Sequence, residues 1–163
     1  MKSGATGVSA RKVWLAVAWV MSGVHLDANP VGDSIPAVEW HTSFDAAREQ
    51  AQRERKKLFI LFTDSEYCRP CKELHRTVLE SDAFRAFARD KLVLFKADEA
   101  HARKDASGEL ASQTERLAKT YPHRGVPWVF IARASGTAIG STGGYLGESP
   151  DRYIDERLRR IVR

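Results

Sequence analysis

Short apolar runs of strand length alternate along this chain with longer segments of helical spacing. The runs 58–63 (LFILFT) and 91–97 (KLVLFKA) are continuous, which predicts central strands that are covered on both faces. The shorter run 37–41 (AVEWH) predicts another strand. Runs 127–132 (PWVFIA) and 137–142 (TAIGST) flank the turn RASG, which predicts a β-hairpin.

Capping residues and a period of three to four predict the helices between these strands. Thr42, with Asp45 three residues later, resembles a capping box and opens the first helix. Ser81 and Ser149 are the expected caps of two later helices, and Pro150 suits the first position of the last one. The expected helices are 43–56, 68–79, 82–89, 112–121 and one that begins at 150.

The polar stretch 98–113 (DEAHARKDASGELASQ) is predicted to be a loop that leads into the helix at 112–121. The whole order is then β-α-β-α-β-α-β-β-α. Strands that alternate with helices and end in a hairpin predict an α/β fold, with a mixed central sheet and helices on both faces.

The first thirty residues differ from the rest. Lys2, Arg11 and Lys12 precede the apolar run 13–24, after which the chain turns polar and contains two prolines before residue 37. This succession is typical of a secretory signal peptide, and twelve residues of helix reach only about 18 Å of a hydrocarbon core of roughly 30 Å. We therefore expect a signal peptide at 1–28, a linker at 29–36, a folded domain at 37–163 and a periplasmic or secreted location. An uncleaved anchor and a buried N-terminal helix are the alternatives.

Length and charge narrow the function classes further. The 163 residues suit one domain, and the formal charge is +5. Without the expected leader the net charge is +3, because the leader holds three basic residues and one acidic residue. So mild a charge gives no reason to expect nucleic acid as a partner.

The only two cysteines, Cys68 and Cys71, lie two residues apart. Covalent haem attachment would need a histidine where Lys72 stands. A disulfide this short would constrain little of the unfolded chain, so a purely structural role is disfavoured. A copper or zinc site stays open, because His75 lies one helical turn beyond Cys71; its fourth ligand would be His101, His123, a carboxylate or water.

Redox chemistry explains the position of the pair as well as its spacing. The cysteines follow a buried strand and open a helix, where free backbone N–H groups favour a thiolate on Cys68. Arg69 adds positive charge, and Pro70 suits a first helical turn. Cys71 falls on the apolar side of the helix with Leu74, Val78 and Leu79, where a shielded thiol suits the resolution of a mixed disulfide.

The strand LFILFT, the motif YCRPC and the downstream RGVPW before another strand together resemble the thioredoxin superfamily, especially its exported single-domain members. The resemblance covers residues 37–162 and the order of the elements. It implies a thioredoxin fold, Cys68 as the attacking cysteine and Cys71 as the resolving one. It also implies substrate-binding positions at Tyr67, in place of a tryptophan, at the cis-proline site Val126–Pro127, and at Gly144.

The sequence departs from this family at two buried positions. Phe62 stands where thioredoxins keep a buried acid, and Leu94 stands where they keep its partner lysine. Asp64 and Glu66 are near in sequence. An apolar floor made by Phe62 and Leu94 beneath Cys71 would slow the loss of its proton.

The resemblance implies a protein-disulfide reductase that acts outside the cytoplasm through a Cys68/Cys71 dithiol–disulfide cycle. The Arg-Pro pair between the cysteines resembles the corresponding pair of reducing family members. Reduction is therefore the expected direction, and oxidase or isomerase activity is the second alternative. The expected partners are protein disulfides and a membrane or extracytoplasmic thiol donor, with no cofactor and a monomeric state. Two other hypotheses are a metal chaperone or sensor that uses Cys68, Cys71 and His75, and a binding module with vestigial redox chemistry.

Overall fold

The computed structural model describes residues 35–163. The predicted signal peptide at 1–28 and nearly all of the predicted linker lie outside the described residues. Within 35–163, no helix combines the length and the apolar character that crossing a membrane requires.

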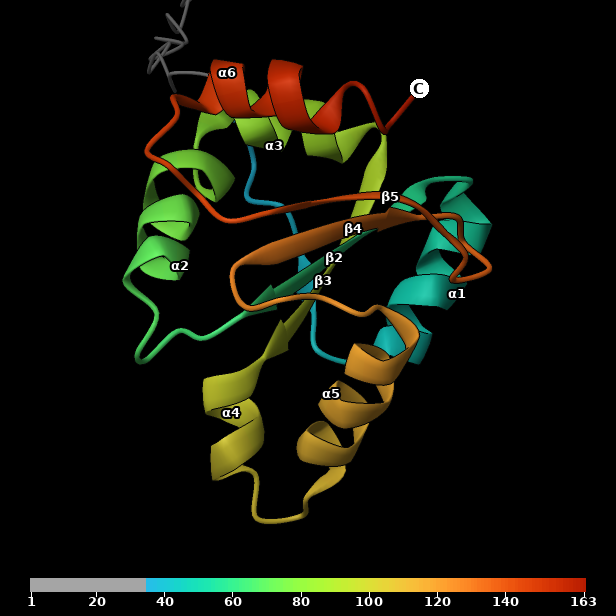
Figure 1. Ribbon diagram of the computed structural model, residues 1–163. Helices are drawn as coiled ribbons and strands as arrows, with labels where there is room; N and C mark the ends of the chain where they lie inside the picture. The colour runs from blue at the N-terminus through green and yellow to red at the C-terminus, as the bar shows by residue number, and fades with distance from the viewer. Residues whose placement is uncertain (1–34) are drawn as a thin grey trace, which may run out of the picture. The chain divides into compact units, whose positions relative to one another are not determined.

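A five-stranded mixed sheet, in the order β1-β3-β2-β4-β5, forms the centre of this domain (Figure 1). β2 pairs in parallel with β3, and antiparallel with β4. The predicted hairpin of β4 and β5 is confirmed, whereas the first strand is shorter than predicted, because only two of its residues pair with β3. The strands are β1 (Trp40–His41), β2 (Lys57–Thr63), β3 (Leu92–Asp98), β4 (Trp128–Ala132) and β5 (Ala138–Gly143).

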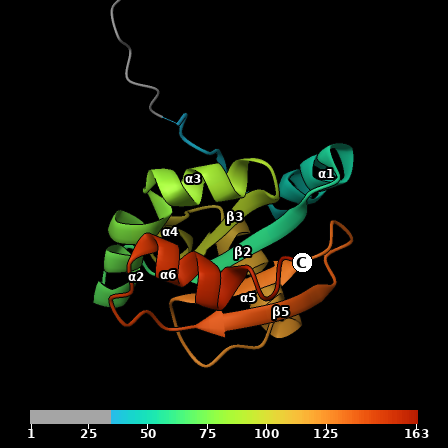
Figure 2. The same ribbon diagram turned by 90° about the horizontal axis from the view of Figure 1, so that it is seen from above.

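Helices cover both faces of the sheet, as predicted. One face carries α2 (Arg69–Leu74), the π-helical turn η1 (His75–Leu79), α3 (Asp82–Arg89), α6 (Pro150–Tyr153) and the π-helical turn η2 (Ile154–Leu158), and α3 and α6 lie on the same side of the sheet in Figures 1 and 2. The other face carries α1 (Phe44–Glu54) and α5 (Glu109–Thr120).

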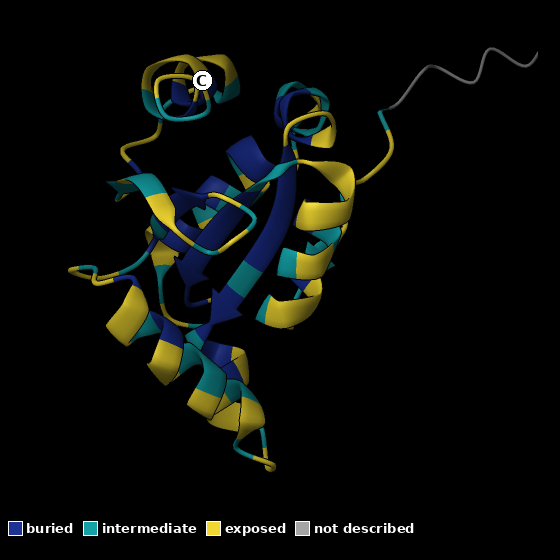
Figure 3. Ribbon diagram, turned by 90° about the vertical axis from the view of Figure 1, so that its right-hand side faces the viewer, coloured by how far each residue is buried: buried dark blue, intermediate teal, exposed yellow. Residues whose placement is uncertain are grey.

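The continuous apolar run of β2 is explained by this two-sided burial. Phe59 and Leu61 point into the core beneath α2, α3 and α6, and Ile60 and Phe62 point into the core beneath α1 and α5. Figure 3 shows the buried strands between helices whose outer surfaces are exposed.

The predicted caps of two later helices are confirmed, whereas the cap of the first helix lies one residue later than predicted. Ser43, not Thr42, caps α1, and its side chain accepts the N–H of Ala46 at 3.4 Å. Thr42 lies one residue too early, and its carbonyl oxygen instead accepts a hydrogen bond from Gln113 at 2.7 Å. Ser81 and Ser149 cap α3 and α6 as predicted.

The loop predicted at 98–113 is wrong. α4 (Glu99–Lys104) occupies its first part, and α5 begins at Glu109, three residues earlier than predicted. The Asp98 carboxylate starts α4 by accepting the N–H of Ala100 at 3.1 Å, and Ala100 is buried. A helix of six residues shows too little periodicity to be recognised, because its few buried positions are alanines among charged residues.

Candidate active site

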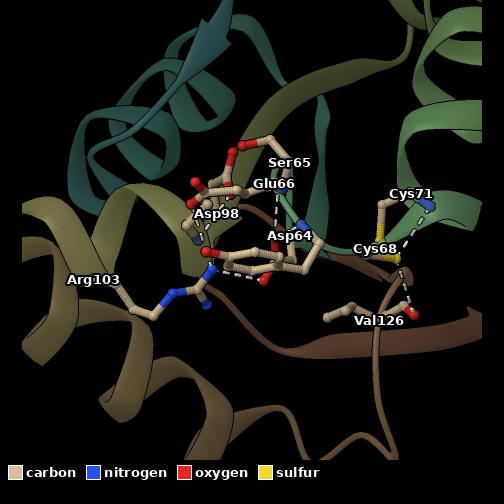
Figure 4. Close-up of a disulfide and its surroundings, with 10 residues drawn as sticks. Asp64, Ser65, Glu66, Cys68, Cys71, Asp98, Arg103 and Val126 are labelled. Atoms are coloured by element: carbon tan, nitrogen blue, oxygen red, sulfur yellow. Dashed lines mark hydrogen bonds and ion pairs between the residues drawn. A yellow bond between two sulfur atoms is a disulfide. The ribbon is translucent and has the colours of Figure 1, made fainter.

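Cys68 and Cys71 form a disulfide, with the sulfurs 2.08 Å apart (Figure 4). Cys68 is the N-cap of α2, and its Sγ accepts the backbone N–H of Cys71 at 3.2 Å. Cys68 is half-buried, whereas Cys71 is only 3% exposed. The two cysteines therefore differ in exposure to solvent, and the more exposed one lies where helix N–H groups favour a thiolate.

A network of hydrogen bonds orders the loop between β2 and Cys68. Asp64 Oδ1 accepts the backbone N–H groups of Glu66 and Tyr67, each at 2.8 Å, and Asp64 Oδ2 accepts from Arg103 of α4 at 2.9 Å (Figure 4). The N–H of Tyr67, then that of Glu66 and the guanidinium of Arg103, lower the pKa of Asp64, although burial acts against them. Tyr67 itself is 77% exposed, and the Arg103 guanidinium lies 5.2 Å from the centre of its ring.

The predicted cis bond between Val126 and Pro127 is confirmed. The carbonyl oxygen of Val126 lies 3.6 Å from Cys68 Sγ, as Figure 4 shows. Gly144 donates its N–H to the carbonyl oxygen of Pro127 at 2.8 Å, and its φ of +71° suits glycine. The structure thus places Val126 beside Cys68 and joins Gly144 to the adjoining Pro127.

Cys71 lines a cavity of about 370 Å³ on the side of the sheet that carries α2. Thr63 and Asp98, which are paired neighbours at the carboxyl ends of β2 and β3, lie in its wall. Its remaining lining is polar and comprises Ser65, Lys72, His75, Lys96 and His101.

The predicted apolar floor beneath Cys71 is wrong for Phe62. Phe62 points to the opposite face of the sheet, where its ring lies 4.2 Å from that of His123. Leu94 is buried in the core on the α2 side, but the cavity beside Cys71 is lined by Lys96 and Asp98 instead. Side chains alternate between the two faces along a strand, so Phe62 and its neighbour Thr63 point to opposite faces. Thr63 is the one that lines the cavity beside Cys71.

No group of three or more histidine, cysteine or acidic side chains in residues 35–163 is arranged to hold a metal ion. His75 Nδ1 lies 3.2 Å from Glu80 Oε1, and His123 lies against Phe62 on the far face of the sheet. The described geometry therefore gives no support to the metal hypothesis based on Cys68, Cys71 and His75.

Three polar residues of this site, Lys96, Asp98 and Arg103, were not predicted as site residues. For Lys96 and Asp98 a signal existed, since they follow Leu92 and Leu94 at alternate positions and so fall on the same face of a buried strand. The role of Arg103 depends on α4, which the sequence pattern did not reveal.

The chain is similar to a known protein family and to several solved structures. Residues 44–156 match the family model described as a thioredoxin-like domain. A DsbH oxidoreductase superposes with a TM-score of 0.70 at 20% identity, over 78% of this chain and 87% of that one. A thioredoxin from Thermus thermophilus gives 0.58 at 17% identity, over 77% and 88%. The C-terminal domain of Neisseria meningitidis DsbD, in the oxidised form, gives 0.51 at 20% identity, over 70% and 89%.

A search of the curated proteins gave no match. Because their sequence identities are 20% or less, the structural neighbours show a shared fold alone. The family match extends over well more than half of the sequence and includes β2, the cysteine pair and the hairpin. The chain belongs to the thioredoxin-like family, with the Cys68–Cys71 disulfide in a Cys-Arg-Pro-Cys motif at the start of α2.

Proposed function

We propose that this protein is a thiol–disulfide oxidoreductase that reduces protein disulfides through a Cys68/Cys71 dithiol–disulfide cycle. The observation that carries the proposal is the unequal pair of sulfurs. Cys68 is partly exposed and lies beside the carbonyl oxygen of Val126. Cys71 is buried, and its sulfur is bonded to that of Cys68. The structural neighbours named as Dsb proteins support the same chemistry.

In this cycle the Cys68 thiolate attacks a disulfide of the partner protein. One partner sulfur leaves as a thiol after taking up a proton, and the other remains bonded to Cys68 as a mixed disulfide. Cys71 then loses its proton and attacks Cys68 Sγ, which releases the second partner thiol and forms the Cys68–Cys71 disulfide. The partner gains two electrons, and the two cysteines lose them.

The surface beside Cys68 is the proposed substrate-binding surface. It consists of Tyr67, Val126, Pro127 and Gly144. The Tyr67 ring is exposed next to Cys68, and the cis-proline loop presents backbone beside the sulfur. An extended segment of the partner protein would pair with this backbone and place its disulfide against Cys68.

We propose that the cycle operates outside the cytoplasm, with a membrane or extracytoplasmic thiol donor. The basic, apolar and polar succession in residues 1–36 supports this location. A donor belongs to the proposal because the Cys68–Cys71 disulfide must regain two electrons before the next turnover. N-terminal sequencing of the protein from its native cell tests the location. A full-length protein found in the cytoplasm would contradict it.

Trapping of mixed disulfides tests the activity. Cys71→Ser protein, incubated with extracts of the native compartment, should retain partner proteins through a bond that dithiothreitol breaks. Cys68→Ser is the matched control and should retain none. The proposal would be wrong if wild-type protein failed to reduce insulin disulfides, or if Cys68→Ser reduced them at the wild-type rate.

A further inference from the structure

Resolution of the mixed disulfide requires Cys71 to lose a proton, although its side chain is buried. A buried thiol resists ionisation unless a base receives its proton. Within residues 35–163, Cys71 lines a cavity with polar side chains, and the carboxylate of Asp98 lies in the wall of the same cavity.

Asp98 has one carboxylate oxygen that accepts hydrogen bonds and one that accepts none within 35–163. Oδ1 accepts the N–H groups of Ser65 and Ala100, each at 3.1 Å. Oδ2 is buried and accepts no hydrogen bond from any residue within 35–163. It lies 3.8 Å from Lys96 Nζ and 3.6 Å from His101 Nδ1. A buried oxygen without a donor is rare and indicates either an ordered water or a functional role.

Asp98 is the most buried carboxylate or imidazole in the cavity. Lys72 and Lys96 are cationic and have no free acceptor at neutral pH. His75 already lies against Glu80 and is 41% exposed at its side chain, and His101 is 56% exposed, whereas the Asp98 side chain is 2% exposed. The titratable groups that line the cavity are Cys71, Lys72, His75, Lys96, Asp98 and His101.

We propose that Asp98 accepts, through water in this cavity, the proton that Cys71 loses when it resolves the mixed disulfide. The proposal rests on the proposed oxidoreductase function. The Cys71 sulfur forms a bond to Cys68 Sγ, and the bond between Cys68 and the partner sulfur breaks. The proton moves from Cys71 through water to Asp98 and then to solvent past His101, while the departing partner thiolate takes a proton from solvent.

The test separates the two steps with the aromatic disulfide DTNB, which releases one coloured thiolate when Cys68 attacks and a second when Cys71 resolves. Asp98→Asn is the informative variant, because the amide oxygen still accepts from Ser65 and Ala100 while the basic oxygen is lost. Glu99→Gln removes the neighbouring charge, which is outside the cavity, and is the matched control.

In Asp98→Asn the first release should occur within about twofold of the wild-type rate, and the second should be slower by about tenfold or more at neutral pH. The gap should narrow at alkaline pH, where solvent removes the proton without help. Glu99→Gln should match the wild type in both releases. If Asp98→Asn does not fold, Asp98→Ser keeps a capping hydroxyl for α4 and serves the same comparison.

An unchanged second release would overturn the proposal, and so would equal slowing of both releases, which would indicate a structural effect. A gap that stays the same from acidic to alkaline pH would also contradict proton transfer. Absence of both releases in wild-type protein would instead overturn the oxidoreductase function itself.

Discussion

Arg103 donates a hydrogen bond to Asp64 at 2.9 Å and so joins α4 to the loop that carries Tyr67 and Cys68. Its guanidinium also lies over the exposed ring of Tyr67. The Arg103 side chain is 46% exposed, and ion pairs that solvent reaches contribute little to overall stability. We infer that this contact chiefly orders the loop before the cysteines.

Replacement of Arg103 by glutamine should loosen that loop without unfolding the protein. The Glu66 and Tyr67 amides should exchange hydrogen faster, because Asp64, which accepts from both, loses its partner on α4. Amide exchange followed by mass spectrometry measures this, with the unfolding temperature as a check. Arg116→Gln, at an exposed position of α5, is the control and should leave these amides unchanged. Unaltered exchange in Arg103→Gln would contradict the assigned role.

The lowered pKa of Asp64 predicts that the free energy of unfolding decreases at acidic pH. The N–H of Tyr67 is the main cause, followed by that of Glu66 and by Arg103, and the ordinary value is 3.8. Since the folded state favours the carboxylate, the contribution is complete well above pH 3.8 and is lost as pH falls through the lower folded value. Urea unfolding of wild-type and Asp64→Asn protein at several pH values measures this. The difference in the free energy of unfolding should shrink in acid, and a constant difference would refute the prediction.

In the reduced protein, Cys68 should react with alkylating reagents before Cys71. Cys68 is partly exposed at the start of α2, whereas Cys71 is 3% exposed. Brief treatment with iodoacetamide at neutral pH, followed by peptide mass mapping, measures the order. Unfolded protein should label equally at both positions. Preferential labelling of Cys71 in the folded protein would reverse the assigned roles.

The redox potential should be nearer to the roughly −270 mV of thioredoxin than to the roughly −120 mV of a strong oxidant. The helix start and Arg69 favour the Cys68 thiolate, which raises the potential. However, Arg69 is hydrogen-bonded to Glu73 at 3.0 Å, and this carboxylate offsets its charge. Equilibration with dithiothreitol or glutathione buffers gives the value. A potential above about −170 mV would mean that the protein oxidises its partners.

Gly143 pairs with Trp128 across the β4–β5 hairpin, and the indole ring occupies the space that a side chain would need. Gly143→Ala should therefore lower the free energy of unfolding by about 1–3 kcal/mol, because the ring must move from its packed position. Denaturant unfolding measures the loss. Ser141→Ala, at an exposed position of the same strand, should change it far less. Equal effects of both substitutions would show that the indole tolerates an added methyl group.

Most of the fold could be predicted from the sequence, because a long apolar run or a capping serine indicates a strand or a helix start without reference to distant residues. β2 and β3 were recognised by their continuous apolar residues, and Ser81 and Ser149 by the helical patterns that follow them. α4 was missed because its six residues hold only two buried alanines among charged residues, which is too few to show a helical period. Its burial against the rest of the domain is decided only when distant segments fold together.

The site was predicted in part for the same reason. The cysteines and the cis-proline loop carry their own motifs, and the structure places Val126 beside Cys68. The surroundings of Cys71 depend instead on which face each strand residue occupies. The prediction placed Phe62 on the wrong face of β2, beneath Cys71. The structure has there a cavity with Asp98 in its wall.

The two sulfurs of the disulfide lie against different surroundings, and this division has a consequence for turnover. Cys68 contacts the cis-proline loop, and Cys71 lines the cavity that contains Asp98. In the proposed cycle, a partner docked on the loop side would cover the first sulfur and leave the cavity beside the second open. Under this proposal, the proton of Cys71 would leave through the cavity while the partner occupies the loop side, so a tightly held partner would not block its own release.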